Sequence, residues 1–169
     1  MIEGNITNLR DIRKSDLKYI EGWINDSEIQ YYSQEEYPVY YNKQLINILY
    51  RDAVSGKIKV FIIEDKLQNI IGELWIYPID YLRKYAEFEI VIGRKDMQNK
   101  GYGKDAINTA KKYCFEELEL NKIYLKVFSF NVRAIRCYKS CGFKITGKIG
   151  EMVERYGILH DEYIMEAYK

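Results

Sequence analysis

A glycine-containing loop between a strand-like run and a helix-like run constrains this chain most. Residues 98–103 read Gln-Asn-Lys-Gly-Tyr-Gly, after the apolar run 86–93 and before the helical run 105–118. Gly101 and Gly103 have no Cβ, so the loop can adopt left-handed dihedrals and let an anion approach the main chain. The free N–H groups and the dipole of the following helix point towards such an anion. The pattern therefore predicts a phosphate-binding loop.

The segments around this loop predict a mixed sheet. Residues 57–63, 70–77 and 85–92 are rich in β-branched and aromatic side chains, which favour strands. Short polar links join the three runs, as expected for an antiparallel meander. Residues 122–128 form another strand after the helical run. The helix is then a right-handed crossover, so this strand is expected to lie parallel to the third strand of the meander.

The N-terminal part predicts one strand and a pair of helices. Residues 6–12 alternate loosely and suit a strand, and Ser15 is expected to cap a helix with apolar residues at helical spacing. Asn42 is expected to cap a second helix that stops near Gly56. Residues 27–41, which are rich in tyrosine, glutamine and glutamate, are interpreted as an irregular or mobile segment.

The end of the chain completes the predicted fold. Asn131 is expected to begin a short helix that Gly142 ends, and residues 143–149 and 160–168 supply two late strands. At 169 residues the chain can build a full hydrophobic core, so residues 1–169 are expected to form a single domain. The predicted fold class is α/β (α+β mixed), a mixed sheet of roughly six to seven strands with about four helices.

Charge and cysteine content exclude several classes of function. The chain has 26 Lys and Arg against 25 Asp and Glu, so no excess of charge favours nucleic acid or a membrane as partner. Cys114, Cys137 and Cys141 lack the spacing of a zinc site, so reduced thiols and no metal are expected. The charged N-terminus does not resemble a signal peptide, and no run approaches the ~18 apolar residues of a membrane span. A cytoplasmic protein is expected.

A second group of polar residues follows strand 122–128. Asn131 and Tyr138 are about two helical turns apart, so they project from nearly the same helix face. This face begins just after strand 122–128, which is expected to lie beside the strand that precedes the glycine loop. Parallel strands that diverge at their C-terminal ends leave a crevice, which is the usual ligand position in such sheets. The loop, the asparagine and the tyrosine are therefore expected to converge on one ligand.

Three motifs in this order resemble a known family. They are the strand FEIVIG at 88–93, the Q-x-x-G-x-G loop at 98–103 and the run NVRAIRCYKSCGF at 131–143. On these motifs the chain resembles the GNAT superfamily, the Gcn5-related N-acetyltransferases that use acetyl-CoA. It is most similar to the branch of ribosomal-protein alanine and spermidine acetyltransferases. The resemblance implies the GNAT fold, in which a twisted mixed sheet is splayed at its centre. It also implies acetyl-CoA as co-substrate and a homodimer.

The resemblance also implies roles for individual residues. The main chain of Ile90 to Ile92 would pair with the pantetheine arm like an added strand. Backbone N–H groups of the loop would hold the pyrophosphate. Asn131 would hydrogen-bond the pantetheine, and Tyr138 would lie near the thioester sulfur and act as general acid. The implied CoA-binding residues are Ile90, Val91, Ile92, Gln98, Asn99, Lys100, Gly101, Tyr102, Gly103, Lys104, Asn131, Ala134 and Tyr138.

The attacking amine must lose its proton first, because an amine with a pKa of ~10 is mostly charged at neutral pH. Glu87 and Glu89 alternate onto one strand face, so either can act as the catalytic base through water, although a solvated strand face explains the pair equally well. Glu73 on the neighbouring strand is a weaker candidate. His160, the one histidine, stands away from the motifs and is interpreted as structural or surface-placed.

The sequence leaves the acceptor open. A protein N-terminus or a polyamine is expected, with an aminoglycoside, an amino sugar or a non-catalytic CoA-binding sensor as the alternatives. A P-loop enzyme is not supported, because Gly103-Lys104-Asp105 lacks the hydroxyl that binds magnesium. A polycation favours an acidic cleft, whereas a peptide needs an open groove. Acidic residues available for a cleft are Glu35, Glu36, Glu73, Glu87 and Glu89, and aromatic residues that either line it or pack ordinarily are Trp23, Tyr31, Tyr32 and Tyr37.

Overall fold

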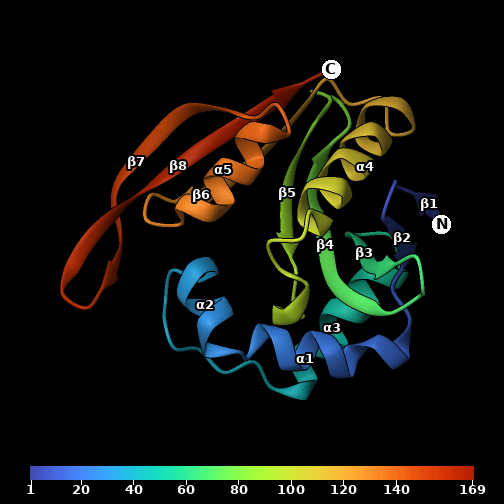
Figure 1. The fold of residues 1–169 in the computed structure, drawn as a ribbon, viewed down its shortest axis with the longest axis horizontal. Coiled ribbons are helices and arrows are strands. Elements are labelled where there is room, and N and C mark those ends of the chain that lie inside the picture. Colours follow the sequence, from blue (N-terminus) through green and yellow to red (C-terminus); the bar gives the residue numbers. More distant parts are fainter.

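The computed structural model describes residues 1–169 and contains one sheet of eight strands with five α-helices (Figure 1). The sheet order is β1-β2-β3-β4-β5-β6-β8-β7, and only β5 and β6 pair in parallel. The strands are β1 (Ile2–Glu3), β2 (Thr7–Asp11), β3 (Lys59–Asp65), β4 (Ile70–Asp80), β5 (Tyr85–Val91), β6 (Lys122–Phe128), β7 (Lys144–Arg155) and β8 (Ile158–Tyr168). The helices are α1 (Leu17–Ile24), α2 (Ser27–Ser33), α3 (Lys43–Val54), α4 (Tyr102–Glu116) and α5 (Val132–Ser140), with 3₁₀ turns η1 (Lys14–Asp16) and η2 (Lys95–Met97).

The predicted meander and crossover are confirmed. β3, β4 and β5 pair antiparallel in sequence order, and α4 leads from β5 to the parallel strand β6. Both predicted asparagine caps are present as well. The Leu45 N–H donates to the Asn42 side chain at 3.0 Å, and the Ala134 N–H donates to the Asn131 side chain at 3.3 Å.

The sheet and helix counts exceed the prediction of six to seven strands and about four helices. The added strand β1 has only two residues, Ile2 and Glu3, which is too short for a recognisable pattern. The added helix α2 lies in the segment 27–41 that was expected to be irregular. The Asp26 carboxylate caps this helix by accepting the N–H groups of Glu28 and Ile29, which offsets its poorly helical composition.

The start of the first helix also differs from the prediction. Ser15 lies inside η1 and does not cap a helix, and α1 begins at Leu17. The Asp16 carboxylate accepts the Arg13 N–H at 2.7 Å and so closes the 3₁₀ turn η1, whereas no side chain caps the first turn of α1.

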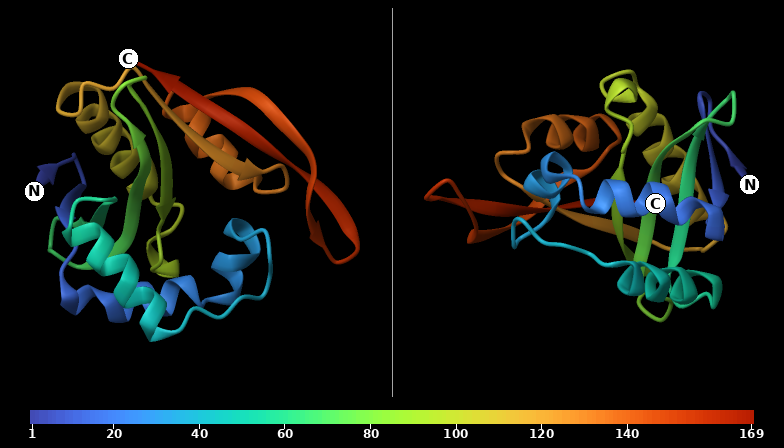
Figure 2. Two further views of the ribbon diagram at one scale, coloured as in Figure 1. Left: turned by 180° about the vertical axis from the view of Figure 1, so that it is seen from behind. Right: turned by 90° about the horizontal axis from the view of Figure 1, so that it is seen from below.

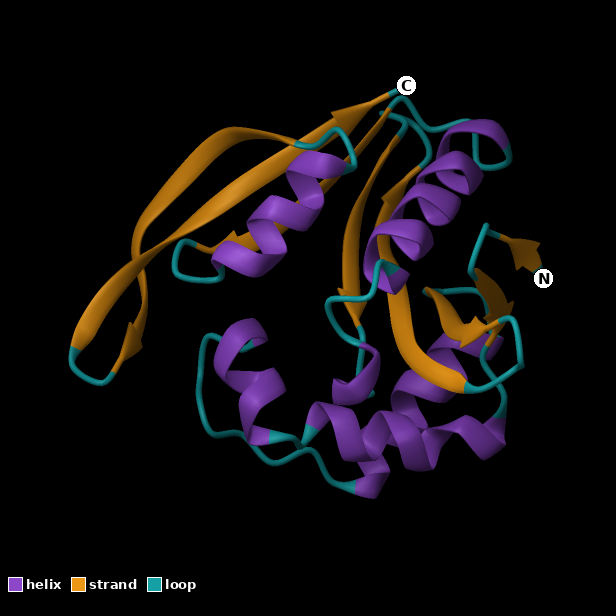
Figure 3. Ribbon diagram, viewed as in Figure 1, coloured by secondary structure: helices purple, strands orange, loops and turns teal.

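Helices cover both faces of the sheet (Figures 2 and 3). α4 and α5 pack on one face, where Ile107 and Ile135 meet Leu74 and Phe88 in the main hydrophobic core. α1 and α3 lie on the opposite face and contact each other. No helix is both long and apolar enough to cross a membrane.

The sheet is splayed at its centre, as predicted. The parallel pairing covers only Tyr85–Glu87 of β5 against Lys122–Tyr124 of β6. Beyond this point the two strands diverge, while β4 and β8 keep pairing with their outer edges (Figure 1). Residues 88–91 of β5 therefore present a main-chain edge that β6 does not occupy.

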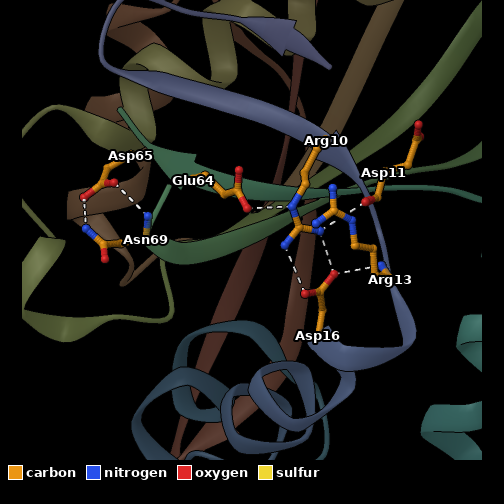
Figure 4. A network of polar contacts seen from close by, with 7 residues as sticks. All are labelled: Arg10, Asp11, Arg13, Asp16, Glu64, Asp65 and Asn69. Atoms are coloured by element: carbon orange, nitrogen blue, oxygen red, sulfur yellow. Dashed lines mark hydrogen bonds and ion pairs between the residues drawn. The ribbon is translucent and has the colours of Figure 1, made fainter. Parts of the chain in front are cut away.

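A buried ion cluster joins the N-terminal elements to the sheet (Figure 4). The Arg10 guanidinium on β2 contacts Asp16 of η1 at 2.7 Å and Glu64 of β3 at 2.6 Å, and all three side chains are buried. Hydrogen bonds to Asp16 outweigh the effect of burial and raise the pKa of Arg10. The cluster fixes the start of α1 against the sheet edge.

We expect Arg10→Met to lower the free energy of unfolding by about 3 kcal/mol, because two buried carboxylates lose their shared cation. Urea unfolding of wild type and variant measures this difference. Arg83→Met is the control, since Arg83 pairs with Asp80 at the surface and little change is expected. Equal effects of the two substitutions would contradict a special role for the buried cluster.

Candidate active site

The glycine loop ends in an open helix N-terminus. Asn99 and Gly101 adopt left-handed φ values of 59° and 88°, and Gly101 is the N-cap residue of α4. The helix thus begins at Tyr102 and not at Asp105, so Gly103 lies in its first turn. The Asp105 N–H donates to the Gly101 carbonyl, whereas the N–H groups of residues 102–104 donate to no carbonyl. Free donors at the positive end of a helix are suited to an anion, and we call this group of amides the anion cradle.

Asp105 explains why this helix end stays open. Its carboxylate accepts the N–H groups of Asn5, Ile6 and Thr7 at 2.9–3.1 Å and the Thr7 hydroxyl at 2.7 Å. Burial opposes ionisation, but the hydrogen bonds from Thr7 and the main chain hold the pKa of Asp105 below its usual value. The carboxylate therefore anchors the β1–β2 connection and leaves the first-turn amides of α4 free.

Gln98 ties the loop to both walls of the site. Its side-chain amide donates to the Ile92 carbonyl at 2.8 Å, and its carbonyl oxygen accepts a hydrogen bond from Arg133 of α5 at 2.7 Å. The Gln98 main-chain N–H is already bonded to Lys95. Gln98 thus acts as a brace in this structure, and the free amides begin after it.

α5 places Asn131 and Tyr138 on the same wall, as their spacing predicted. Asn131 caps the helix, and both residues line the crevice. Tyr138 is 9 % exposed and packs against Phe143 at a ring distance of 5.9 Å. Burial, helped by Cys137 and Glu89, raises the pKa of Tyr138, so its hydroxyl keeps its proton at neutral pH.

Two adjoining cavities of about 280 and 290 Å³ open where β5 and β6 diverge. The cavity of about 290 Å³ extends over the loop and α4. The cavity of about 280 Å³ extends towards α2 and has Val91 and Asn131 on its walls. Lys100 and Tyr102 line neither. The residues common to both are Ile90, Ile92, Gln98, Arg133, Ala134 and Tyr138, and those of the loop side also include Asn99, Gly101, Gly103 and Lys104. Tyr138 therefore stands at the junction of the two cavities.

The cavity on the α2 side, which we call the acidic cavity, carries excess negative charge. Lys95 pairs with Glu28 at 2.9 Å and Lys126 with Glu87 at 3.6 Å. The carboxylates that line the acidic cavity are Glu28, Glu35, Glu87, Glu89 and Glu162, and the cationic side chains that line it are Lys95, Lys126 and Arg133. Glu35, Glu89 and Glu162 have no ion-pair partner, so the cavity is electrostatically suited to a cation.

Crowding of these carboxylates affects their protonation. Burial in the cavity wall and the nearby Glu87 raise the pKa of Glu89. Burial also raises the pKa of Glu162, with Lys126 opposing the shift and Glu35 and Glu87 adding to it. A bound cation would relieve the repulsion and favour the ionised forms.

The structure places the two predicted catalytic carboxylates in different situations. Glu87 and Glu89 both face the acidic cavity. Glu87 accepts a hydrogen bond from the Tyr124 hydroxyl at 2.9 Å and pairs with Lys126. Glu89 has neither contact and is open to the cavity. Of the pair, Glu89 is therefore the freer proton acceptor.

The remaining candidates lie outside the cavity, with one exception. Tyr32 lines the acidic cavity, whereas Trp23 packs beneath Gly93 in the interior. Glu73 is 4 % exposed, and Glu36 is exposed on the loop after α2; neither lines a cavity. His160 packs on the Phe130 ring at 4.7 Å, which agrees with its structural interpretation.

The sequence pattern did not identify several residues of the site. Glu162 reaches the acidic cavity because β8 pairs with β6, with Glu162 opposite Phe128. Lys126 shares a strand face with Tyr124, so strand alternation could have identified that pair once β6 was placed. To identify Glu162, the register of the strand pairing must be known. To identify Asp105, its distant partners Asn5 to Thr7 must be known.

Comparison with known proteins agrees with this geometry. The sequence profile described as "Acetyltransferase (GNAT) domain" matches residues 7–144. A spermidine N(1)-acetyltransferase from Vibrio cholerae is 32% identical over 94% of this chain and 92% of its own length, and one from Escherichia coli K12 is 27% identical over 100% and 84%. A crystal structure of the Vibrio cholerae spermidine N-acetyltransferase in complex with CoA and spermine superposes with a TM-score of 0.87 at 32% identity, covering 96% of this chain and 95% of that one.

Proposed function

The chain belongs to the GNAT acetyltransferase family, and on this premise we propose that it transfers the acetyl group of acetyl-CoA to a primary amine of a polyamine such as spermidine. One observation carries the choice of acceptor: an acidic cavity with three unpaired carboxylates joins an anion cradle at Tyr138. The relatives named for spermidine acetylation support the same choice. Residues 1–169 are proposed to act as one domain, since all strands share one sheet. The homodimer expected from the resemblance stays a prediction.

The residues present fit acetyl-CoA as the donor substrate. The free amides of Tyr102, Gly103 and Lys104 at the positive end of α4 suit a pyrophosphate. The unpaired edge of β5 at residues 88–91 suits the amide groups of a pantetheine arm. These two elements meet at the cavity junction, so they would direct a thioester towards Tyr138.

The acceptor amine would enter from the acidic cavity. Its remote ammonium groups would find Glu35 and Glu162, and the reacting nitrogen would lose a proton to Glu89, directly or through water. The pKa of Glu89 is raised and therefore lies closer to the pKa of an amine, which favours the proton transfer. Binding in the two joined cavities would hold amine and thioester together, and such orientation alone can contribute roughly 7–11 kcal/mol.

The chemical step would then proceed by direct attack. The amine nitrogen would form a bond to the thioester carbonyl carbon, and a main-chain N–H of Ile90 or Val91 would stabilise the oxyanion. The C–S bond breaks as the tetrahedral intermediate collapses. Tyr138 donates its hydroxyl proton to the departing thiolate, and the second proton that the attacking nitrogen loses returns to the Tyr138 oxygen through water.

A thiol-release assay with acetyl-CoA and a panel of amines tests the acceptor. We expect kcat/KM for spermidine and spermine to exceed the values for glucosamine and alanine- or serine-starting peptides by at least about tenfold, because only a polycation engages several carboxylates at once. Kanamycin, which is also a polycation, tests whether the acidic cavity selects a linear one. Preference for a peptide or amino sugar would refute the polyamine proposal within the family. Coenzyme binding without release for any amine would favour the non-catalytic sensor.

A further inference from the structure

The buried guanidinium of Arg155 at the end of β7 has no carboxylate partner. Arg155 is 4 % exposed. Its guanidinium donates hydrogen bonds to main-chain carbonyls instead of pairing with a carboxylate. Its Nε donates to the Tyr31 carbonyl at 3.0 Å, and one terminal nitrogen donates to the Gln34 carbonyl. The other terminal nitrogen donates to the Glu35 carbonyl at 3.3 Å and to the adjacent Glu154 carbonyl at 2.9 Å. A buried cation is tolerated only when such partners replace water.

Aromatic rings complete the surroundings of this cation. The rings of Tyr31 and Tyr37 lie 5.5 and 5.3 Å from the guanidinium carbon, and those of Phe128 and Phe130 lie 5.4 and 5.9 Å away. Cation–π contacts of this kind are stronger away from water. Arg155 thus joins three separate parts of the chain: the end of β7, the segment after α2 and the end of β6.

The carbonyls that Arg155 holds belong to a wall of the acidic cavity. They belong to the C-terminal half of α2 and the two residues that follow it, and Tyr32, Ser33 and Glu35 of the same stretch line the cavity. Arg155 itself does not line the cavity. α2 has seven residues, and so short a helix is not stable without outside contacts.

Other contacts anchor the start of this segment. The Gln30 side chain bonds the carbonyls of Ile24 and Val39 and the Val39 N–H, which closes the segment into a loop. Lys95 pairs with Asp26 and Glu28 at the start of α2.

Arg155 supplies the hydrogen bonds between the end of this segment and the far side of the splayed sheet. The rings of Tyr31 and Tyr32 also pack on Phe130 there, but ring contacts fix the main chain of residues 34 and 35 less closely than hydrogen bonds to their carbonyls.

We infer that Arg155 is a positioning residue for the acceptor: it clamps residues 31–35 to the β7–β8 hairpin and so holds Glu35 and Tyr32 at the distance a polyamine requires. Its part in acceptor recognition rests on the proposed function. The glycine loop and α4 lie outside the clamp, so CoA binding is not expected to depend on it. Lysine cannot replace arginine here, because a single ammonium cannot fork to three carbonyls while stacking on aromatic rings.

Kinetics of Arg155→Met and Arg155→Lys test the inference, with Arg51→Met on exposed α3 surface as the control. We expect both Arg155 variants to raise KM for spermidine roughly tenfold, with kcat within about threefold of wild type. The CoA dissociation constant, measured by calorimetry, should stay within about twofold, and Arg51→Met should change none of these values. A KM equal to wild type, or a CoA affinity lost in parallel with acceptor affinity, would overturn the inference.

Hydrogen–deuterium exchange supplies a readout that needs no activity. In Arg155→Met the amides of residues 28–36 should exchange at least about tenfold faster, while those of α4 keep their wild-type rates. Unchanged exchange at 28–36, or equal acceleration throughout the chain, would show that no local clamp exists. If wild type fails to acetylate spermidine, the proposed function fails, and the exchange pattern alone then decides whether the clamp is real.

Discussion

Replacing Tyr138 by phenylalanine is expected to lower kcat for acetyl transfer by at least about 100-fold while the CoA dissociation constant remains within about twofold of wild type. The substitution removes one hydroxyl at the junction of the two cavities and keeps the ring that packs on Phe143. The departing thiolate would then have to take its proton from water. Because burial keeps the Tyr138 hydroxyl protonated at neutral pH, its proton-donating form is present without any change in conditions.

The matched control for this experiment is Tyr113→Phe. Tyr113 is another partly buried tyrosine, on α4, where its ring meets Phe61 edge-on at 5.3 Å and lines neither cavity. We expect its kcat to match wild type. Thiol release at saturating spermidine and acetyl-CoA measures both variants, and calorimetry with CoA measures binding. A Tyr138→Phe enzyme with wild-type kcat would refute the general-acid assignment and leave the family assignment intact.

The motif region could be predicted from the sequence because its signals are local. Gly101 requires a left-handed φ, Asn131 caps the helix that follows it, and the seven-residue spacing to Tyr138 fixes a shared face whatever lies elsewhere in the chain. The divergence of β5 and β6 follows from the same reasoning, since the parallel strand and the loop before α4 dictate the crevice.

The acceptor side could not be predicted in the same way, because its geometry depends on contacts between distant segments. Glu162 enters the cavity through the β6–β8 register, and Arg155 reaches α2 across more than a hundred residues of chain. α2 itself has little helical propensity and depends on its Asp26 cap and on Arg155. Periodicity within a window of residues carries no information on such partners.

Glu73 shows a conflict between core packing and charge that the sequence pattern also concealed. Its side chain is 4 % exposed on the central strand β4, and its Oε2 has no hydrogen-bond partner. Burial raises the pKa of Glu73 to about 8, and Glu89 adds to the shift against a hydrogen bond from Trp75. At neutral pH the folded protein therefore holds a neutral carboxyl group where the unfolded chain would hold a carboxylate.

This difference makes the stability of the protein depend on pH with a definite sign. Below the unfolded pKa of about 4.5, both states bind the proton, so Glu73 adds no pH-dependent cost to folding. Between pH 4.5 and 8 only the folded state keeps it, so each pH unit lowers the free energy of unfolding by about 1.4 kcal/mol. Above pH 8 the loss levels off at about 5 kcal/mol in total.

Glu73→Gln should remove this dependence, because a glutamine amide has nearly the shape of the protonated carboxyl group and does not ionise. We expect the variant to gain stability relative to wild type steadily from pH 5 to pH 8, by about 1.4 kcal/mol per unit. Urea unfolding at half-unit pH steps measures the gain.

The control is Glu117→Gln, at the exposed C-cap residue of α4, and it should follow wild type throughout. Because the test uses the change with pH, any constant cost of the new amide cancels. Parallel curves for wild type and Glu73→Gln would mean that Glu73 is ionised in the folded protein, with water or a main-chain donor reaching its second oxygen.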